Sequence, residues 1–161
     1  MTSGESLLSV GALLVFSLVS LNFNSSVLQN TTVEVENKVY LTAFSLADDL
    51  IEEVKQKAFD AATVNFPTTN TASLTPAGSL GPANWEDYPF YNDIDDFNGF
   101  EKDVSAPHAE NYEVSCQVYY VDKDNPDVVS STQTFYKKVT VTVNSPYLRN
   151  PVQLSQIFTH K

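Results

Sequence analysis

The apolar residues near the start of the chain form one continuous run. No residue between Glu5 and Glu34 is charged, and Leu7–Phe23 is apolar except for serines, one glycine and one asparagine. At ~1.5 Å of rise per residue this run covers about 25 Å as a helix, close to the ~30 Å hydrocarbon core of a bilayer. We expect residues 1–30 to form an apolar helix half that lies in a membrane or in the core of a protein assembly.

A second hydrophobic pattern follows, and no proline interrupts it before Pro67. Apolar residues recur every three or four positions from Val39 to Ala58, which places them on one face of a helix. The two patterns together predict a single helix over about residues 5–60, on the order of 80 Å long. Its half at residues 31–62 is expected to be amphipathic.

The rest of the chain carries loop and strand patterns. Residues 63–111 are rich in Pro, Thr, Asn and Asp and contain eight acidic side chains but one basic side chain, which predicts an acidic loop region with sparse regular structure. Within residues 112–161, alternating apolar and polar positions predict three strands, at Val114–Tyr120, Phe135–Val143 and Val152–Phe158. The turn residues between them favour an antiparallel sheet whose strands are neighbours in chain order.

These elements together predict an α+β fold. One face of the small sheet needs an apolar cover, and the stripe from Val39 to Ala58 is the long amphipathic surface that can supply it. We expect the second half of the helix to pack on the sheet, while the apolar first half protrudes without cover. Cys116 falls on the inward face of its strand, so we expect a small core residue there.

Composition narrows the classes of function. The chain of 161 residues has 20 acidic and 9 basic side chains, a net charge of −11 at pH 7. Binding of nucleic acids depends on clustered Lys and Arg, so we expect no nucleic-acid partner. The two histidines, His108 and His160, lie far apart and no nucleophile motif accompanies them. We expect surface histidines and no catalytic activity.

Three segments of the chain match patterns of a known family. In the first eight residues, Met1-Thr2-Ser3-Gly4-Glu5-Ser6-Leu7-Leu8, a glutamate is fifth and directly precedes the apolar run. The others are Tyr91–Gly99, which contains Asp-Asp-Phe-Asn-Gly, and the strand Lys137–Val143, which is followed by Ser145-Pro146. The first segment resembles the mature start of type IV pilins and pseudopilins, the prepilin-like family. The other two are similar to segments of minor-pilin-like heads.

The resemblance implies a structural subunit of an extracellular filament on the cell surface. It implies identical subunits as partners in a helical homopolymer, storage in the inner membrane before assembly, and action by a prepilin peptidase and an assembly machinery. It also implies that Glu5 pairs with the N-terminal amine of Met1 in a neighbouring subunit. Met1 is then the mature first residue, and cleavage after Gly4 is the alternative. The apolar residues expected in the filament core are Leu7, Leu8, Val10, Leu13, Leu14, Phe16, Leu18 and Leu21.

The physical chemistry of Glu5 is compatible with that interpretation. A carboxylate at the edge of a lipid or protein core costs several kcal/mol unless it is paired, and no Lys or Arg precedes Lys38. In a plain membrane anchor, Glu5 would instead lie among lipid headgroups, where the helix dipole favours it. Two other functions therefore stay open: a minor pseudopilin of a type II secretion system, and a membrane-anchored extracytoplasmic binding module.

The acidic loop region also suggests a calcium site, since Ca²⁺ takes roughly six to eight oxygen ligands. The candidate ligands are Asp93, Asp95, Asp96, Asn98 and Glu101. Their spacing departs from the EF-hand pattern, because with Gly99 at the turn position the loop would run from Ile94 to Ser105, neither of which suits its place. The alternative is a solvated acidic loop whose aromatic residues pack on the sheet. We expect no cofactor apart from this candidate calcium ion.

Overall fold

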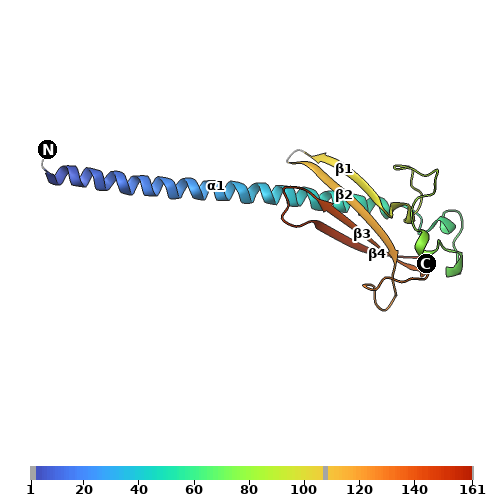
Figure 1. The fold of residues 1–161 in the computed structure, drawn as a ribbon. Coiled ribbons are helices and arrows are strands. Elements are labelled where there is room, and N and C mark those ends of the chain that lie inside the picture. The colour runs from blue at the N-terminus through green and yellow to red at the C-terminus, as the bar shows by residue number, and fades with distance from the viewer. Residues whose placement is uncertain (1–2, 107–108, 161) are drawn as a thin grey trace. The chain divides into compact units, whose positions relative to one another are not determined.

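A computed structural model describes residues 3–106 and 109–160 of the chain, with the side chains of residues 29–30 and 109–110 left outside the description. Its main elements are helix α1 (Ser3–Val54) and the strands β1 (Phe100–Ala106), β2 (Ala109–Tyr120), β3 (Tyr136–Asn144) and β4 (Val152–Thr159) (Figure 1). The chain divides into two compact units, residues 1–38 and residues 39–161, which we describe separately. We call the second unit the head.

The head has the predicted α+β fold. Its four strands form one antiparallel sheet in the order β1-β2-β3-β4, as expected for strands that pair in chain order. The part of α1 from Val39 to Val54 packs against this sheet (Figure 1). Val39, Ala43 and Ala47 are fully buried on the helix side. The predicted amphipathic stripe therefore supplies the apolar cover that the sheet needs.

The sheet side of this core follows the predicted alternation. The inward residues of β2 and β3 are buried, whereas the residues between them are mostly exposed or half-buried. The buried inward set consists of Tyr112, Val114, Cys116, Val118, Tyr120, Lys137, Val139, Val141 and Val143. Along β2 and β3 a period of two residues places one face of each strand on the helix, and hydrophobic burial on that face holds the sheet in register.

Helix α1 ends at Val54, earlier than the predicted end near residue 60. The apolar spacing continues through Ala58, but the backbone leaves the helix and Ala58 forms a parallel bridge with Asp93. Phe59 and Asp60 then enter the buried interior of the head. The prediction was wrong here because the distant partners of residues 58–60 do not show in a local pattern.

The sheet also has one strand more than predicted. Strand β1 lies in the region expected to be loop, and β2 begins at Ala109 rather than near Val114. In β1 only Phe100 is buried, and Glu101, Lys102 and Asp103 are exposed, so the hydrophobic alternation is missing. Strand β1 lies at an edge of the sheet, where charged residues are common because just one side of the strand is paired.

The segment between α1 and β1 contains sparse regular structure, as predicted. It holds four short 3₁₀ helices, at Ala61–Thr63, Thr71–Ser73, Ala77–Ser79 and Asp95–Phe97. The last of these ends in Asn98 and then Gly99, which has a φ of 81°. Gly99 suits this left-handed conformation because it lacks a Cβ atom. The turn leads directly into β1.

Candidate functional site

The first candidate site is the apolar helix surface, which we define as the side chains of residues 7–28. Every residue of α1 from position 3 to position 28 is exposed. The eight residues expected in a filament core range in exposure from 56% at Val10 to 77% at Leu7. Helix α1 is long and apolar enough to cross a membrane. The described structure therefore leaves the apolar surface without cover from its own chain.

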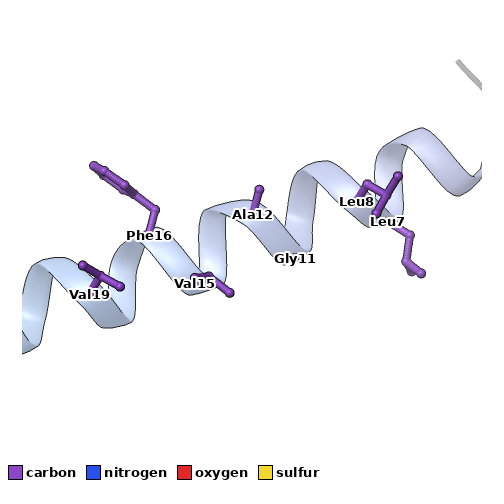
Figure 2. Close-up of a pocket in the computed structure, with 7 residues that line it drawn as sticks. All are labelled: Leu7, Leu8, Gly11, Ala12, Val15, Phe16 and Val19. Atoms are coloured by element: carbon purple, nitrogen blue, oxygen red, sulfur yellow. The ribbon is translucent and has the colours of Figure 1, made fainter.

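Part of this surface forms a shallow groove along the helix. Its lining residues are Leu7, Leu8, Gly11, Ala12, Val15, Phe16 and Val19. Figure 2 shows the side chains of Leu7 and Phe16 on either side of a stretch where Gly11 carries none. A Cβ added at Gly11 would meet nothing within 4 Å. Small residues of this kind let a second helix approach closely in an apolar environment.

Three serine hydroxyls of this part of α1 are bonded within the helix. The hydroxyl of Ser9 donates to the carbonyl of Glu5 at 2.9 Å, and that of Ser17 donates to the carbonyl of Leu13 at 2.8 Å. Ser26 makes the same contact with the carbonyl of Asn22 at 3.0 Å. Hydroxyls bonded four residues back do not need water as a partner. This arrangement suits a helix surrounded by lipid or protein.

The expected partner of Glu5 is not part of the described structure. Glu5 lies in the first turn of α1, where its charge is favourable for the helix dipole. Met1 lies outside the described residues, so the pairing of Glu5 with a neighbouring N-terminal amine stays a prediction.

The second candidate site is the buried charge cluster of the head, which consists of Asp60, Asp93, Asp95, Asp96 and Lys137. Each of these side chains is at most 2% exposed. The ammonium group of Lys137 donates to Oδ2 of Asp60 at 2.7 Å, to the carbonyl of Phe59 at 2.8 Å, and to Oδ1 of Asp95. Lys137 thus lies between two carboxylates in a site closed to solvent.

Asp60 accepts hydrogen bonds at both of its carboxylate oxygens. Besides Lys137, the hydroxyl of Tyr120 donates to it at 2.9 Å, and the amide groups of Ala62 and Thr75 donate at 3.1 Å. Burial works to raise the pKa of Asp60, but the hydrogen bond and charge of Lys137, together with the hydrogen bonds from Ala62 and Tyr120, outweigh it and leave the pKa below its ordinary value. Asp60 is therefore held as a carboxylate.

Asp95 has a different environment although it shares the same lysine. Its Oδ1 atom contacts Lys137, while its buried Oδ2 atom has no hydrogen-bond partner among the described residues. Burial raises the pKa of Asp95 to about 7, against the opposing effect of Lys137. One lysine therefore faces two different carboxyl groups: Asp60, which is stabilised by several hydrogen bonds, and Asp95, which is poorly stabilised.

Asp93 and Asp96 complete the cluster and bind the loop backbone. The carboxylate of Asp96 accepts from the amides of Asn92 at 2.9 Å and Asp93 at 3.2 Å, and that of Asp93 accepts from the amide of Asp95 at 2.7 Å. Burial, followed by the negative charge of Asp96, raises the pKa of Asp93 to about 6. These bonds fix the turn that carries Asp95 toward Lys137.

The other two proposed calcium ligands, Asn98 and Glu101, do not belong to the buried charge cluster. The amide of Asn98 bridges the carbonyl of Leu80 at 3.0 Å and the backbone N–H of Val118 at 3.0 Å, and Glu101 is exposed on β1. Among the residues that the structure describes, no group of three or more His, Cys, Asp and Glu side chains is arranged to hold a metal. Calcium binding stays a prediction.

Sequence reasoning missed the roles of Asp60 and Lys137. A signal was present, because Lys137 shares the inward register of β3 with Val139 and Val141. A lysine at an inward position needs a buried anion nearby. The pattern could have shown that a partner was required, but it could not have shown that the partner comes from Asp60, 77 residues earlier in the chain.

The expectations for Cys116 and His160 had different outcomes. Cys116 is buried, and burial raises the pKa of its thiol to about 12, so it is the small core residue that was predicted. His160 is not a lone surface histidine. Its ring lies 5.4 Å from that of Phe59 and 5.6 Å from that of Phe135, and its Nε2 atom is 3.0 Å from the carbonyl of Thr68. His108 lies outside the described residues.

No protein-family model, no curated protein and no solved structure gave a significant match to the chain.

Proposed function

We propose that the protein is a structural subunit of an extracellular filament of the type IV pilus kind, and that the apolar helix surface is its assembly surface. The observation that carries this proposal is the continuous exposure of apolar side chains over residues 7–28 of α1. Burial of a Leu or Phe side chain contributes roughly 1.5–3 kcal/mol. A surface of this size is stable only when lipid or another apolar surface covers it.

Two environments can cover the apolar helix surface in turn. Before assembly, the helix would lie in the inner membrane, which its length and composition allow. In the filament, the same side chains would contact the helices of identical subunits. The hydroxyls of Ser9 and Ser17, bonded to their own helix, make both environments acceptable.

The groove around Gly11 favours packing between helices over a plain anchor. Lipid tails cover leucine as well as another helix does, so association in an apolar phase depends on close contact at small residues. Gly11 and Ala12 provide such a place between Leu7 and Phe16 (Figure 2). We assign this groove to a neighbouring helix of the same chain.

Glu5 would set the position of one subunit against the next. Glu5 lies two residues before Leu7, the first residue of the groove, and pairing with the amine of Met1 in a neighbour would neutralise both charges within the apolar core. In this proposal a prepilin peptidase and an assembly machinery prepare and extrude the subunit, and the protein has no catalytic role of its own.

The test is sedimentation of material sheared from the surface of cells that produce the protein. We expect the wild type to pellet as fibres, and we expect Glu5→Gln and Glu5→Ala to abolish the pellet while the variants still fractionate with the membrane. The control is Glu34→Gln, which removes the same charge from a position beyond the apolar run. This control should leave fibre formation unchanged.

The same assay separates the proposal from its alternatives. A membrane-anchored binding module would yield no sedimentable fibres from the wild type and would be indifferent to Glu5→Gln. That result would contradict the proposal. A minor pseudopilin would appear in fibres at a small fraction of the total subunits, which the stoichiometry of purified fibres would reveal.

A further inference from the structure

The buried charge cluster contains an unequal pair of carboxyl groups on one lysine. Both Asp60 and Asp95 contact Nζ of Lys137, and all three side chains are at most 2% exposed. Asp60 has four hydrogen-bond donors besides Lys137, from Ala62, from the amide and hydroxyl of Thr75 and from Tyr120. The Oδ2 atom of Asp95 has none among the described residues.

An ion pair accounts poorly for this arrangement. A buried carboxylate oxygen without a donor loses its hydration and gains nothing in return, which costs the free energy of its desolvation. The rings of Phe59 and Tyr120 lie 4.5 Å and 5.0 Å from Nζ of Lys137, so water is displaced from the amine as well. The site holds an amine and a carboxyl group in contact under conditions that exclude water.

We propose that Lys137 and Asp95 form an intramolecular amide bond, with Asp60 as the group that transfers the proton. The bond would join Nζ of Lys137 to Cγ of Asp95 and expel Oδ2 of Asp95 as water. This inference concerns the head alone and does not depend on filament assembly.

The reaction balances without an oxidant or a second substrate. A proton first passes from the ammonium of Lys137 to Asp95, which leaves a neutral amine and a neutral carboxylic acid. Nζ then attacks Cγ, Asp60 accepts a proton from the nitrogen and delivers it to the departing hydroxyl, and the C–O bond breaks. The products are a secondary amide and one water molecule, and Asp60 returns to its carboxylate form.

The difference between the two aspartates assigns their roles. The acid must be neutral to accept a nucleophile, and the raised pKa of Asp95, about 7, means that it takes up a proton readily. The base must be ionised, and the hydrogen bonds that Asp60 accepts from Ala62, Thr75 and Tyr120 stabilise its carboxylate also when the amine of Lys137 is neutral. Asp60 also lies 2.7 Å from Nζ, within reach of the proton that the nitrogen loses.

The product would remove the features that make the ion pair unfavourable. The amide carries no charge, so the buried site loses one cation and one anion. The carboxylate of Asp60 then no longer faces a cation and is stabilised by the hydrogen bonds from Ala62, Thr75 and Tyr120. The site also loses Oδ2 of Asp95, the atom without a donor. Contact between the reacting groups replaces a bimolecular encounter, and the closed site limits the reverse hydrolysis.

The experiment is mass spectrometry of the full-length protein, purified folded, then denatured and digested with trypsin. Trypsin does not cleave after a lysine whose amine is acylated. We therefore expect a branched product that joins residues 58–102 to residues 124–138, lighter by one water than the sum of the two peptides. Fragmentation of this product should place the branch on Asp95 rather than on Asp60, which lies in the same peptide.

Three variants assign the chemistry. Lys137→Arg keeps the buried positive charge but should give linear peptides alone, and Asp60→Asn should reduce the linked fraction at least tenfold because the proton acceptor is missing. The matched control, Lys138→Arg, changes the neighbouring lysine on the other face of β3 and should keep the full linked fraction.

The wild-type digest decides the matter even if a variant fails to fold. Linear peptides 58–102 and 124–137 at their unmodified masses, recovered from folded wild-type protein, would overturn the proposal and leave an ordinary buried ion pair. A branch on Asp60 would overturn the assignment of the two aspartates.

Discussion

The two parts of α1, residues 3–38 and 39–54, have the same secondary structure, but apolar side chains are exposed in the first part and many are buried in the second. In the first part, Leu7 is 77% exposed and Phe16 is 71% exposed, whereas in the second part Val39 and Ala43 are fully buried. The sheet covers the second part, and no described residue of the chain buries the side chains of the first. Hydrophobic burial inside the chain therefore stabilises the head, and the first part depends on an environment outside the chain.

Charge shows the reverse distribution. The apolar helix surface contains no charged side chain, while the head buries Lys137 together with Asp60 and Asp95. A buried charge is tolerated where hydrogen bonds and an opposite charge compensate for lost hydration. The head can supply those partners because the sheet and the loop before it place distant residues side by side. A single helix cannot do so.

The largest effect is expected from breaking the buried charge cluster. Lys137→Met removes the nitrogen that contacts both Asp60 and Asp95, whether it is bonded to Asp95 or paired with it as an ion, and leaves both carboxyl groups buried without that partner. The free energy of unfolding of the head should fall by about 3–5 kcal/mol. Urea denaturation of the full chain in detergent, followed by circular dichroism of the sheet, measures the loss.

The control for this prediction is the same substitution one residue later. Lys138 forms its ion pair with Asp127, which is 86% exposed, so Lys138→Met should have a far smaller effect on stability. Equal losses for the two variants would contradict the view that the head depends on a buried cluster.

The second largest effect is expected from placing a charge in the apolar helix surface. Leu14 lies near the middle of the apolar run and is 61% exposed. Leu14→Asp should oppose membrane insertion by about 2.5–3.5 kcal/mol, and both the membrane-bound fraction and the fibre yield should fall.

The head should be indifferent to this change, because Leu14 belongs to the other compact unit. The urea midpoint of the head in Leu14→Asp should equal that of the wild type. The comparison fails if the variant still fractionates with membranes or if the head loses stability.

Local patterns in the sequence predicted the elements whose stability comes from one repeating contact. The amphipathic stripe from Val39 marks the helix face that packs on the sheet, and the alternation around Val141 marks the sheet face that packs on the helix. The apolar run before Glu34 likewise predicted the apolar half of the helix. These features define the α+β fold and the apolar helix surface without knowledge of any distant contact.

The features that were missed depend on contacts between distant residues. Strand β1 forms because β2 pairs with it, although Glu101 and Asp103 give it no hydrophobic alternation. Helix α1 stops at Val54 because Ala58 bridges Asp93. The contact between Asp95 and Lys137 was also missed, because it joins the loop region to strand β3, 42 residues later in the chain.

A moderate effect of pH should sharpen the contrast between the head and the helix. The pKa of Asp93 is raised from 3.8 to about 6 by burial and by Asp96, so the folded state holds this proton more tightly than the unfolded state. Protonation then stabilises the fold as pH falls from about 7 to about 5. At lower pH, protonation of Asp60, whose pKa is lowered, destabilises the fold. We expect maximal stability of the head near about pH 5.

Asp93→Asn tests the cause, because asparagine can still accept the 2.7 Å hydrogen bond from the amide of Asp95. Urea midpoints measured between about pH 5 and about pH 7 should depend less on pH in this variant than in the wild type. If the amide bond between Lys137 and Asp95 forms, Asp95 does not titrate. Asp93 then accounts for a larger share of the change in urea midpoint with pH. An unchanged slope in Asp93→Asn would show that Asp93 is not the group responsible.

The smallest effect is expected from an exposed aromatic residue of the head. Trp85, the only tryptophan of the chain, is 83% exposed, more than Phe16 at 71%. If exposure alone marked an assembly surface, both residues would matter equally. We expect Trp85→Ala to change the free energy of unfolding of the head by less than about 0.5 kcal/mol and to leave the fibre yield unchanged. Phe16→Ala should reduce the fibre yield, since Phe16 flanks the groove at Gly11. This expectation rests on the difference between a single exposed side chain, which needs no partner, and a continuous apolar surface, which does. A loss of fibres in Trp85→Ala would contradict it and would extend the assembly surface to the head.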